Sequence, residues 1–91
     1  MTTHRREVHY SGDVQGVGFR YTARRVAEGF TVNGFVRNLA DGRVYLVVEG
    51  DEAEVASFLA ELAHLMSGYI RQAAVETVPA TGEFSGFTIR H

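Results

Sequence analysis

The hydrophobic pattern of this 91-residue chain changes between a repeat of two and a repeat of about 3.6 residues, and the order of these changes limits the folds available to it. Over residues 6–14 apolar and polar residues alternate, which predicts a strand. Over residues 19–30 apolar residues recur at helical spacing, and Gly29 is typical of a helix end. The chain is therefore expected to start with a strand and a helix.

The next two segments predict a β-hairpin. Residues 31–39 and 43–50 are rich in strand-forming residues, and Asp41 and Gly42 lie between them. Asp-Gly between two such runs is a strong hairpin signal, because glycine adopts the left-handed backbone that a tight turn requires. Gly34 interrupts the first run and indicates a bulge or a close approach of another backbone.

The rest of the chain is predicted to contain a second helix and two more strands. Asp51 precedes an apolar stripe of helical spacing, and Glu54 follows three residues later, which is the spacing of a capping box. We therefore predict a helix over residues 51–66. It is followed by a strand over 69–78, a turn region over 79–86 and a short strand over 87–90.

This order of elements predicts an α+β fold of the ferredoxin-like type, a βαββαβ sandwich, in a single domain over residues 1–91. Its antiparallel sheet is expected to carry both helices on one face and to gain an extra C-terminal strand. In this plan the third strand lies between the first two. Those two strands end at the same edge of the sheet, about 10 Å apart, because each strand spacing is ~4.8 Å.

Composition excludes several classes of function. The chain has no cysteine and no lysine, and its nine basic residues other than histidine are all arginine. This excludes disulfides, thiol catalysis, iron–sulfur clusters, Walker-type phosphate loops and Schiff-base chemistry. A net charge of −2 provides no basic field for nucleic acid, and no segment resembles a signal peptide or a membrane span. We expect a cytoplasmic monomer without nucleic-acid or membrane partners.

Three glycines lie just before the first predicted helix, in the segment GDVQGVGFRYT. At such a strand-to-helix junction unpaired N–H groups point outward, and glycine lets the backbone curl around a bound group. The arginine of this segment adds a planar, permanently charged fork that suits a phosphate. We therefore predict a phosphate-binding loop formed by Gln15, Gly16, Val17, Gly18, Phe19 and Arg20.

Asn38 ends the second predicted strand and shares the phase of the apolar residues Val32 and Val36. Its side chain is therefore expected on the helix-covered face, at the sheet edge where the glycine loop begins. A gap of the expected width holds one small anion and a water. The sequence thus predicts Arg20 and Asn38 in one small anion site.

Two segments, GDVQGVGFR and GFVRNLADGRVYLVVEG, resemble the two signature motifs of the acylphosphatases. The resemblance covers the whole chain and implies hydrolysis of the carboxyl–phosphate bond of small-molecule acyl phosphates, without a metal or another cofactor. It implies that Arg20 binds the phosphoryl group and that Asn38 positions the attacking water, so these two are the expected catalytic residues. The chain departs from many members over residues 66–71 and at Arg90–His91, where members often end in an aromatic residue. These departures bear on substrate preference and on the packing of the C-terminus.

The reaction implied by this resemblance needs no acid–base pair. Its leaving group is a carboxylate whose pKa, about 4 to 5, is close to that of an ordinary side-chain carboxyl, so it departs without protonation. A loose phosphoryl-transfer transition state also asks little of the water. Orientation by Asn38 and charge stabilisation by the loop and Arg20 are then sufficient sources of catalysis.

Two other classes of function share some of these features. A noncatalytic module that binds acyl phosphates or other anions would use the same loop, but would be expected to lack Arg20 or Asn38. An RNA-recognition domain has the same order of elements. Its aromatic motif belongs on a central strand, whereas GVGFRY precedes a helix here.

The remaining polar residues are expected to be structural or solvated. The arginine pairs at 5–6 and 24–25 are predicted on solvated faces, and the second pair is close enough to the loop to attract anions. The histidines lack the paired spacing of a metal site and are expected at the surface or partly packed. They are His4, His9, His64 and His91.

Overall fold

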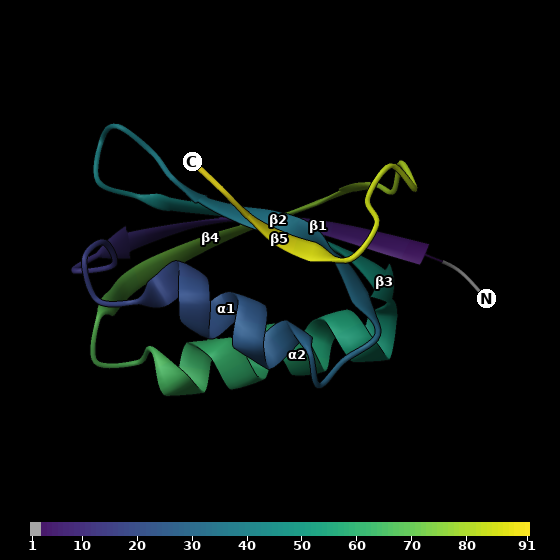
Figure 1. Cartoon of the computed structure of the whole chain (residues 1–91), viewed down its shortest axis with the longest axis horizontal. Helices are drawn as coiled ribbons and strands as arrows, with labels where there is room; N and C mark the ends of the chain where they lie inside the picture. Colours follow the sequence, from purple (N-terminus) through teal and green to yellow (C-terminus); the bar gives the residue numbers. More distant parts are fainter. Residues whose placement is uncertain (1–2) are drawn as a thin grey trace.

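A computed structural model describes residues 3–91, in which two helices form one layer against a five-stranded sheet (Figure 1). The order across the sheet is β4-β1-β3-β2-β5, so β3 lies between β1 and β2 as predicted. Both helices cover the same face of the sheet, which confirms the ferredoxin-like α+β arrangement. The strands are β1 (Thr3–Gly12), β2 (Val32–Asn38), β3 (Val44–Asp51), β4 (Ile70–Pro79) and β5 (Phe87–Arg90), and the helices are α1 (Phe19–Ala27) and α2 (Glu52–Leu65).

The added C-terminal strand differs from the other strands in its pairing, which is the one parallel pairing in the described sheet. β1 pairs antiparallel with β3 and β4, and β2 pairs antiparallel with β3. β5 lies at the outer side of β2 and runs parallel to it, with Gly34 opposite Phe87 and Arg37 opposite Arg90. The next residue, His91, is therefore level with the end of β2 at Asn38.

The core forms between the sheet and the helices. Each helix buries one apolar stripe, and alternate residues of each central strand face the helices, as the two periodicities predicted. β3 also buries Val47 and Glu49, which lie on its other face. Removal of this apolar surface from water is the main force that holds the layers together. The buried helix residues are Phe19, Ala23, Ala27, Val55, Phe58 and Leu62, and those of the central strands are Val8, Tyr10, Val32, Val36, Val44, Leu46 and Val48.

The opposite face of the sheet is partly covered by the segment that joins β4 to β5. Glu49 of β3 is only 3% exposed and accepts hydrogen bonds from the N–H groups of Thr81 and Gly82 at 2.9 and 3.0 Å. Arg5 donates to the same carboxylate at 3.0 Å, and its side chain is 12% exposed. The prediction of a solvated face for Arg5 was therefore wrong, because this ion pair lies beneath the segment.

Most predicted strand boundaries differ from the structure by one to three residues, and two of these differences have a clear physical reason. β1 ends at Gly12, and Val14 lies in the following loop. Its side chain is nevertheless fully buried. The alternation of apolar and polar residues therefore continues past the end of the strand, which is why the strand was predicted to end too late. β4 extends to Pro79, which was predicted to begin a turn. β4 is an edge strand, where a residue without an N–H group is tolerated.

The start of α2 lacks the predicted capping box. Asp51 occupies the N-cap position, but its side chain makes no capping hydrogen bond. Glu54 instead accepts a hydrogen bond at 2.8 Å from the N–H of Thr31, in the connection between α1 and β2. The prediction was wrong because the Glu54 carboxylate accepts this tertiary hydrogen bond instead of the local one that a capping box requires.

Gly34 marks a close approach of two backbones, which was one of its two predicted meanings. Its φ is 150°, and a Cβ at this position would collide with the carbonyl group of Val47 on β3. The pairing of β2 with β3 continues through Gly34 without a register shift, so there is no bulge. Only glycine fits where these two strands approach.

Candidate active site

The glycine-rich loop that was predicted to bind phosphate connects β1 to α1. Gly16 and Gly18 both have a φ of 78°, in the left-handed region that residues with a side chain rarely adopt. An added Cβ at either position would meet no atom of the described chain within 4 Å. Backbone conformation, and not crowding, therefore requires glycine at these two positions.

The start of α1 presents hydrogen-bond donors that the helix itself does not use. The N–H of Thr22 donates to the carbonyl of Gly18 at 2.9 Å, and the N–H groups of residues 19–21 come before this bond. No side chain caps this end of the helix, and its first turn contains no acidic residue. The free donors and the positive end of the helix dipole together favour an anion.

Gln15 fastens the loop to the β2–β3 hairpin. Its Nε2 donates to the carbonyl oxygens of Leu39 and Arg43, at 2.8 and 2.9 Å. These two residues also close the hairpin, since the N–H of Leu39 donates to the carbonyl of Arg43 at 2.8 Å. The side-chain amide thus holds the loop next to the end of β2, where Asn38 lies.

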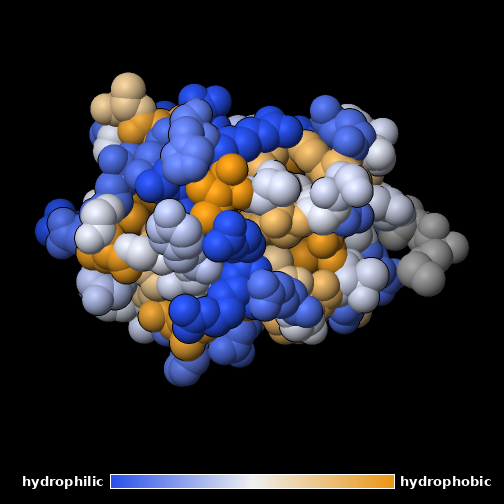
Figure 2. Space-filling model, in the orientation of Figure 1, coloured by the Kyte–Doolittle hydropathy of each residue, from blue (hydrophilic) through white to orange (hydrophobic). Residues whose placement is uncertain are grey.

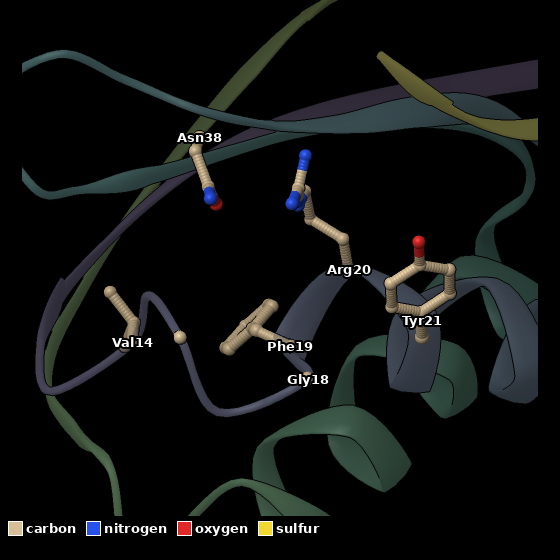
Figure 3. Close-up of a pocket in the computed structure, with 7 residues that line it drawn as sticks. Val14, Gly18, Phe19, Arg20, Tyr21 and Asn38 are labelled. Carbon is tan, nitrogen blue, oxygen red and sulfur yellow. The ribbon is translucent and has the colours of Figure 1, made fainter. Parts of the chain in front are cut away.

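Asn38 directs its side-chain amide toward the loop (Figure 3). It is the last residue of β2, and it lies on the helix-covered face because it is in phase with the buried residues Val32 and Val36. Among residues 3–91, its Oδ1 is the one buried side-chain oxygen or nitrogen that has no hydrogen-bond partner. Such an atom costs stability, so its retention needs an explanation.

Arg20 is the second residue of α1 and extends toward the sheet edge (Figure 3). Its Nη1 donates to Nδ1 of His91 at 3.2 Å. None of the ion pairs within residues 3–91 includes Arg20. Its charge is therefore not neutralised by a carboxylate of the described chain, and it is available to an anion.

These groups meet at one cavity of about 170 Å³. This volume is several times the ~30 Å³ that a water molecule occupies in the liquid, so it suits a group of a few non-hydrogen atoms. No carboxylate and no imidazole is among its lining residues. Those residues are Val14, Gly16, Gly18, Phe19, Arg20, Tyr21 and Asn38.

The cavity brings together most of the predicted site residues, but not all of them. Gln15 points to the hairpin, and Val17 packs against the core, so neither side chain lines the cavity. Val14 and Tyr21 line it and were not predicted. The position of Tyr21 directly after Arg20, in the first turn of a helix, is the signal that would have identified it.

The base of the cavity is buried and apolar. Phe19 is 2% exposed, and its ring lies 4.8 Å from the ring of Tyr10, measured between centroids. Burial raises the pKa of the Tyr10 hydroxyl above its ordinary value, so this group stays neutral. Low polarity beneath the cavity strengthens the interaction of Arg20 and the helix start with an anion.

Comparisons with known proteins lead to one family. The family model described as Acylphosphatase matches residues 6–89. A relative named Acylphosphatase from Archaeoglobus fulgidus is 53% identical over 53 residues, which are 58% of this chain and 60% of that relative. Another, with the same name, from Thermotoga petrophila is 40% identical over 86 residues, 93% of this chain and 94% of that one.

A solved structure agrees with these sequence relatives. The crystal structure of acylphosphatase from Bacillus subtilis superposes on this chain with a TM-score of 0.86 at 27% sequence identity. The superposition covers 97% of this chain and 99% of the other. The likeness therefore extends over nearly the whole fold.

Proposed function

Since this chain belongs to the acylphosphatase family and hydrolyses acyl phosphates, we propose that the cavity between the glycine loop and Asn38 is where it does so. Arg20 and the N–H groups of the loop and of the first turn of α1 bind the phosphoryl group. Asn38 orients the attacking water. No metal ion takes part.

The observation that carries this proposal is the buried, unpartnered Oδ1 of Asn38. A carboxamide oxygen accepts hydrogen bonds, so a water that donates to it is held with a lone pair free to attack. The same cavity contains the guanidinium of Arg20, which suits the phosphoryl oxygens. The arrangement thus supports the proposed pair of roles, a water acceptor and an anion-binding group at one small cavity.

The proposed step is a displacement at phosphorus. The water oxygen forms a bond to phosphorus while the bond from phosphorus to the acyl oxygen breaks, and the carboxylate leaves with that electron pair. A proton of the water passes to the phosphate product or to solvent. Arg20 and the N–H donors of the loop stabilise the negative charge on the equatorial oxygens. Removal of one such donor often raises the activation free energy by about 3 kcal/mol.

The metal-free part of the proposal is supported by the kinds of residue at the cavity. Its polar side chains are those of Arg20, Tyr21 and Asn38, and a cationic arginine in this position disfavours a nearby cation. Within residues 3–91 no three His, Asp or Glu side chains are grouped as a metal site would require. Arg20 would then supply the positive charge that a metal supplies in other phosphoryl-transfer sites.

We further propose that the protein is a monomer with a single domain, residues 1–91, and that it is located in the cytoplasm. Figure 2 shows apolar areas separated by hydrophilic residues on one face of the molecule, with no single apolar area dominating that face. Neither helix of the described chain has the length and apolar character needed to cross a membrane. Size-exclusion chromatography with light scattering is expected to give the mass of one chain, 10.0 kDa.

Isotope labelling tests which bond breaks. Hydrolysis of an acyl phosphate in ¹⁸O-labelled water is expected to place the label in inorganic phosphate, because the water attacks phosphorus. Label in the carboxylate product would instead mean attack at the carbonyl carbon, and it would overturn the roles given to Arg20 and Asn38. The uncatalysed reaction at the same pH serves as the reference.

Substitution of Arg20 tests the phosphoryl-binding role. Arg20→Ala is expected to lower kcat/KM by at least about 10²-fold, because it removes charged donors to the transition state. Arg25→Ala is the matched control, since Arg25 is exposed on the same helix and does not line the cavity. Wild-type activity is expected to persist in excess chelator, and a loss that a divalent cation restores would contradict the metal-free proposal.

A further inference from the structure

Tyr21 lines the cavity but has no role in the reaction proposed above. The residue is 57% exposed, which is high for a residue with a large aromatic ring. The guanidinium of Arg24 lies over its ring, 5.5 Å from the centroid. This contact favours one orientation of the ring and leaves much of it open to solvent.

The cavity has too little room for a bulky acyl group beside the phosphoryl group and the water. About 170 Å³ is several times the ~30 Å³ of one water, so an acetyl group fits inside, whereas a ring-sized acyl group must extend past the cavity's rim. Val14 and Phe19 are buried at the base, and the two lining glycines have no side chain. Tyr21 is therefore the lining residue that offers an exposed apolar surface at the rim.

The direction of the proposed displacement points to the same residue. Attack and departure are roughly in line at phosphorus, so the acyl group leaves on the side opposite the attacking water. The water is held by Asn38, and in Figure 3 Arg20 lies between Asn38 and Tyr21. With the phosphoryl group on Arg20, the acyl group extends toward Tyr21.

We propose that Tyr21 is a specificity-determining residue whose ring contacts the acyl group, so that the site prefers acyl phosphates with a planar, apolar acyl group over acetyl phosphate. This inference rests on the proposed roles of Arg20 and Asn38. The ring of such a substrate packs against the tyrosine ring, as pairs of aromatic side chains do in proteins. Acetyl phosphate has only a methyl group to place there and gains little from the contact.

The test compares benzoyl phosphate with acetyl phosphate as substrates of the full chain. In Tyr21→Ala the ratio of kcat/KM for benzoyl phosphate to that for acetyl phosphate is expected to fall about fivefold, mainly through KM, as loss of an aromatic pair predicts. Tyr21→Phe keeps the ring and is expected to keep the ratio. Tyr69→Ala removes another exposed tyrosine, one that does not line the cavity, and is also expected to keep it.

Inhibition by inorganic phosphate separates the acyl contact from the phosphoryl site. Phosphate lacks an acyl group, so a rise of its inhibition constant in Tyr21→Ala equal to the rise of KM would place Tyr21 at the phosphoryl site and overturn the proposal. An unchanged substrate ratio in Tyr21→Ala, with activity lost in Arg20→Ala and Asn38→Ala, would overturn it and leave the proposed function intact. Full activity in Asn38→Ala would instead overturn the proposed function, and with it the direction that leads to Tyr21.

Discussion

At the scale of single residues, the two asparagines of the chain, both in β2, form a natural pair. Oδ1 of Asn33 accepts a hydrogen bond at 2.9 Å from the N–H of Gly86. Oδ1 of Asn38 is buried and has no partner within residues 3–91. A satisfied amide adds to the free energy of unfolding, whereas a buried unsatisfied one subtracts from it. The two positions are therefore expected to respond to alanine in opposite ways.

Asn38→Ala is expected to lower kcat by about 10²-fold, because the attacking water loses its acceptor. Its free energy of unfolding is expected to stay level or rise. Asn33→Ala is expected to lose about 1 kcal/mol of unfolding free energy with little change in kcat. Steady-state kinetics and urea unfolding of both variants measure this contrast, and a loss of stability without loss of activity in Asn38→Ala would contradict it.

Some residues of the cavity could be predicted from the sequence and others could not. Arg20 and Asn38 were predictable because strand phase and motif spacing place each of them relative to the sheet. Val14 was assigned to a strand because its burial continued the alternation, although the chain had already left the sheet. The contact of His91 with Arg20 depends on the direction of β5, which four residues of strand pattern do not specify.

At the scale of elements, the site depends on how the glycine loop is fixed to the hairpin. Gln15 donates to two carbonyl groups that close the hairpin, and each of those groups accepts from the backbone as well. Both contacts require a donor at this position. The chemistry of the side chain, and not only its length, therefore holds the loop and β2 together.

Gln15→Glu is expected to be at least as harmful as Gln15→Ala, although glutamate has nearly the shape of glutamine. An ionised carboxylate only accepts hydrogen bonds, so it faces two carbonyl oxygens without a donor. We expect each variant to lose about 1–2 kcal/mol of unfolding free energy and to raise KM, because the loop donors shift. Urea unfolding and kinetics at neutral pH measure both effects, and a Gln15→Glu variant equal to wild type would contradict the donor role.

The helices and strands were largely predictable, because burial of one face sets the periodicity of apolar residues in each of them. The predictions that failed did so where a tertiary contact replaced a local one. The hairpin around Gly42 follows from local turn chemistry, and Gly42 has a positive φ of 94°. The capping box at Glu54 failed because Thr31, distant in sequence, takes the carboxylate. A local sequence pattern predicts the structure that a segment favours by itself. Where two local structures have similar free energies, a contact with a residue distant in sequence decides which one forms.

At the scale of the whole molecule, a buried carboxylate ties the β4–β5 connection to the sheet. Burial on its own raises the pKa of Glu49, but the N–H groups of Thr81 and Gly82 and the guanidinium of Arg5 outweigh it and lower the pKa below its ordinary value of 4.5. A carboxyl whose pKa is lower in the folded state favours folding when ionised. This contribution is present above pH 4.5 and is lost as the pH falls through the lower folded value.

Glu49→Gln is therefore expected to be less stable than wild type by about 2 kcal/mol at pH 7, because the hydrogen bonds to the charged carboxylate are weakened while Arg5 keeps Glu7 and Glu83 as partners. The difference between the two proteins is expected to shrink as the pH falls below about 4. Urea unfolding at several pH values measures it, with Glu61→Gln on the exposed face of α2 as the control. A difference that stayed constant down to pH 3 would show that the charge of Glu49 is not responsible.

The contact between Arg20 and His91 joins two residues 71 positions apart, and this separation bears on how the molecule folds. Contacts between distant parts of a chain form late, because closing a long loop costs entropy before the contact repays it. The cavity likewise joins residues 14–21 to Asn38, so it is complete only when such distant contacts have formed. Recovery of hydrolysis during refolding therefore reports the formation of these contacts.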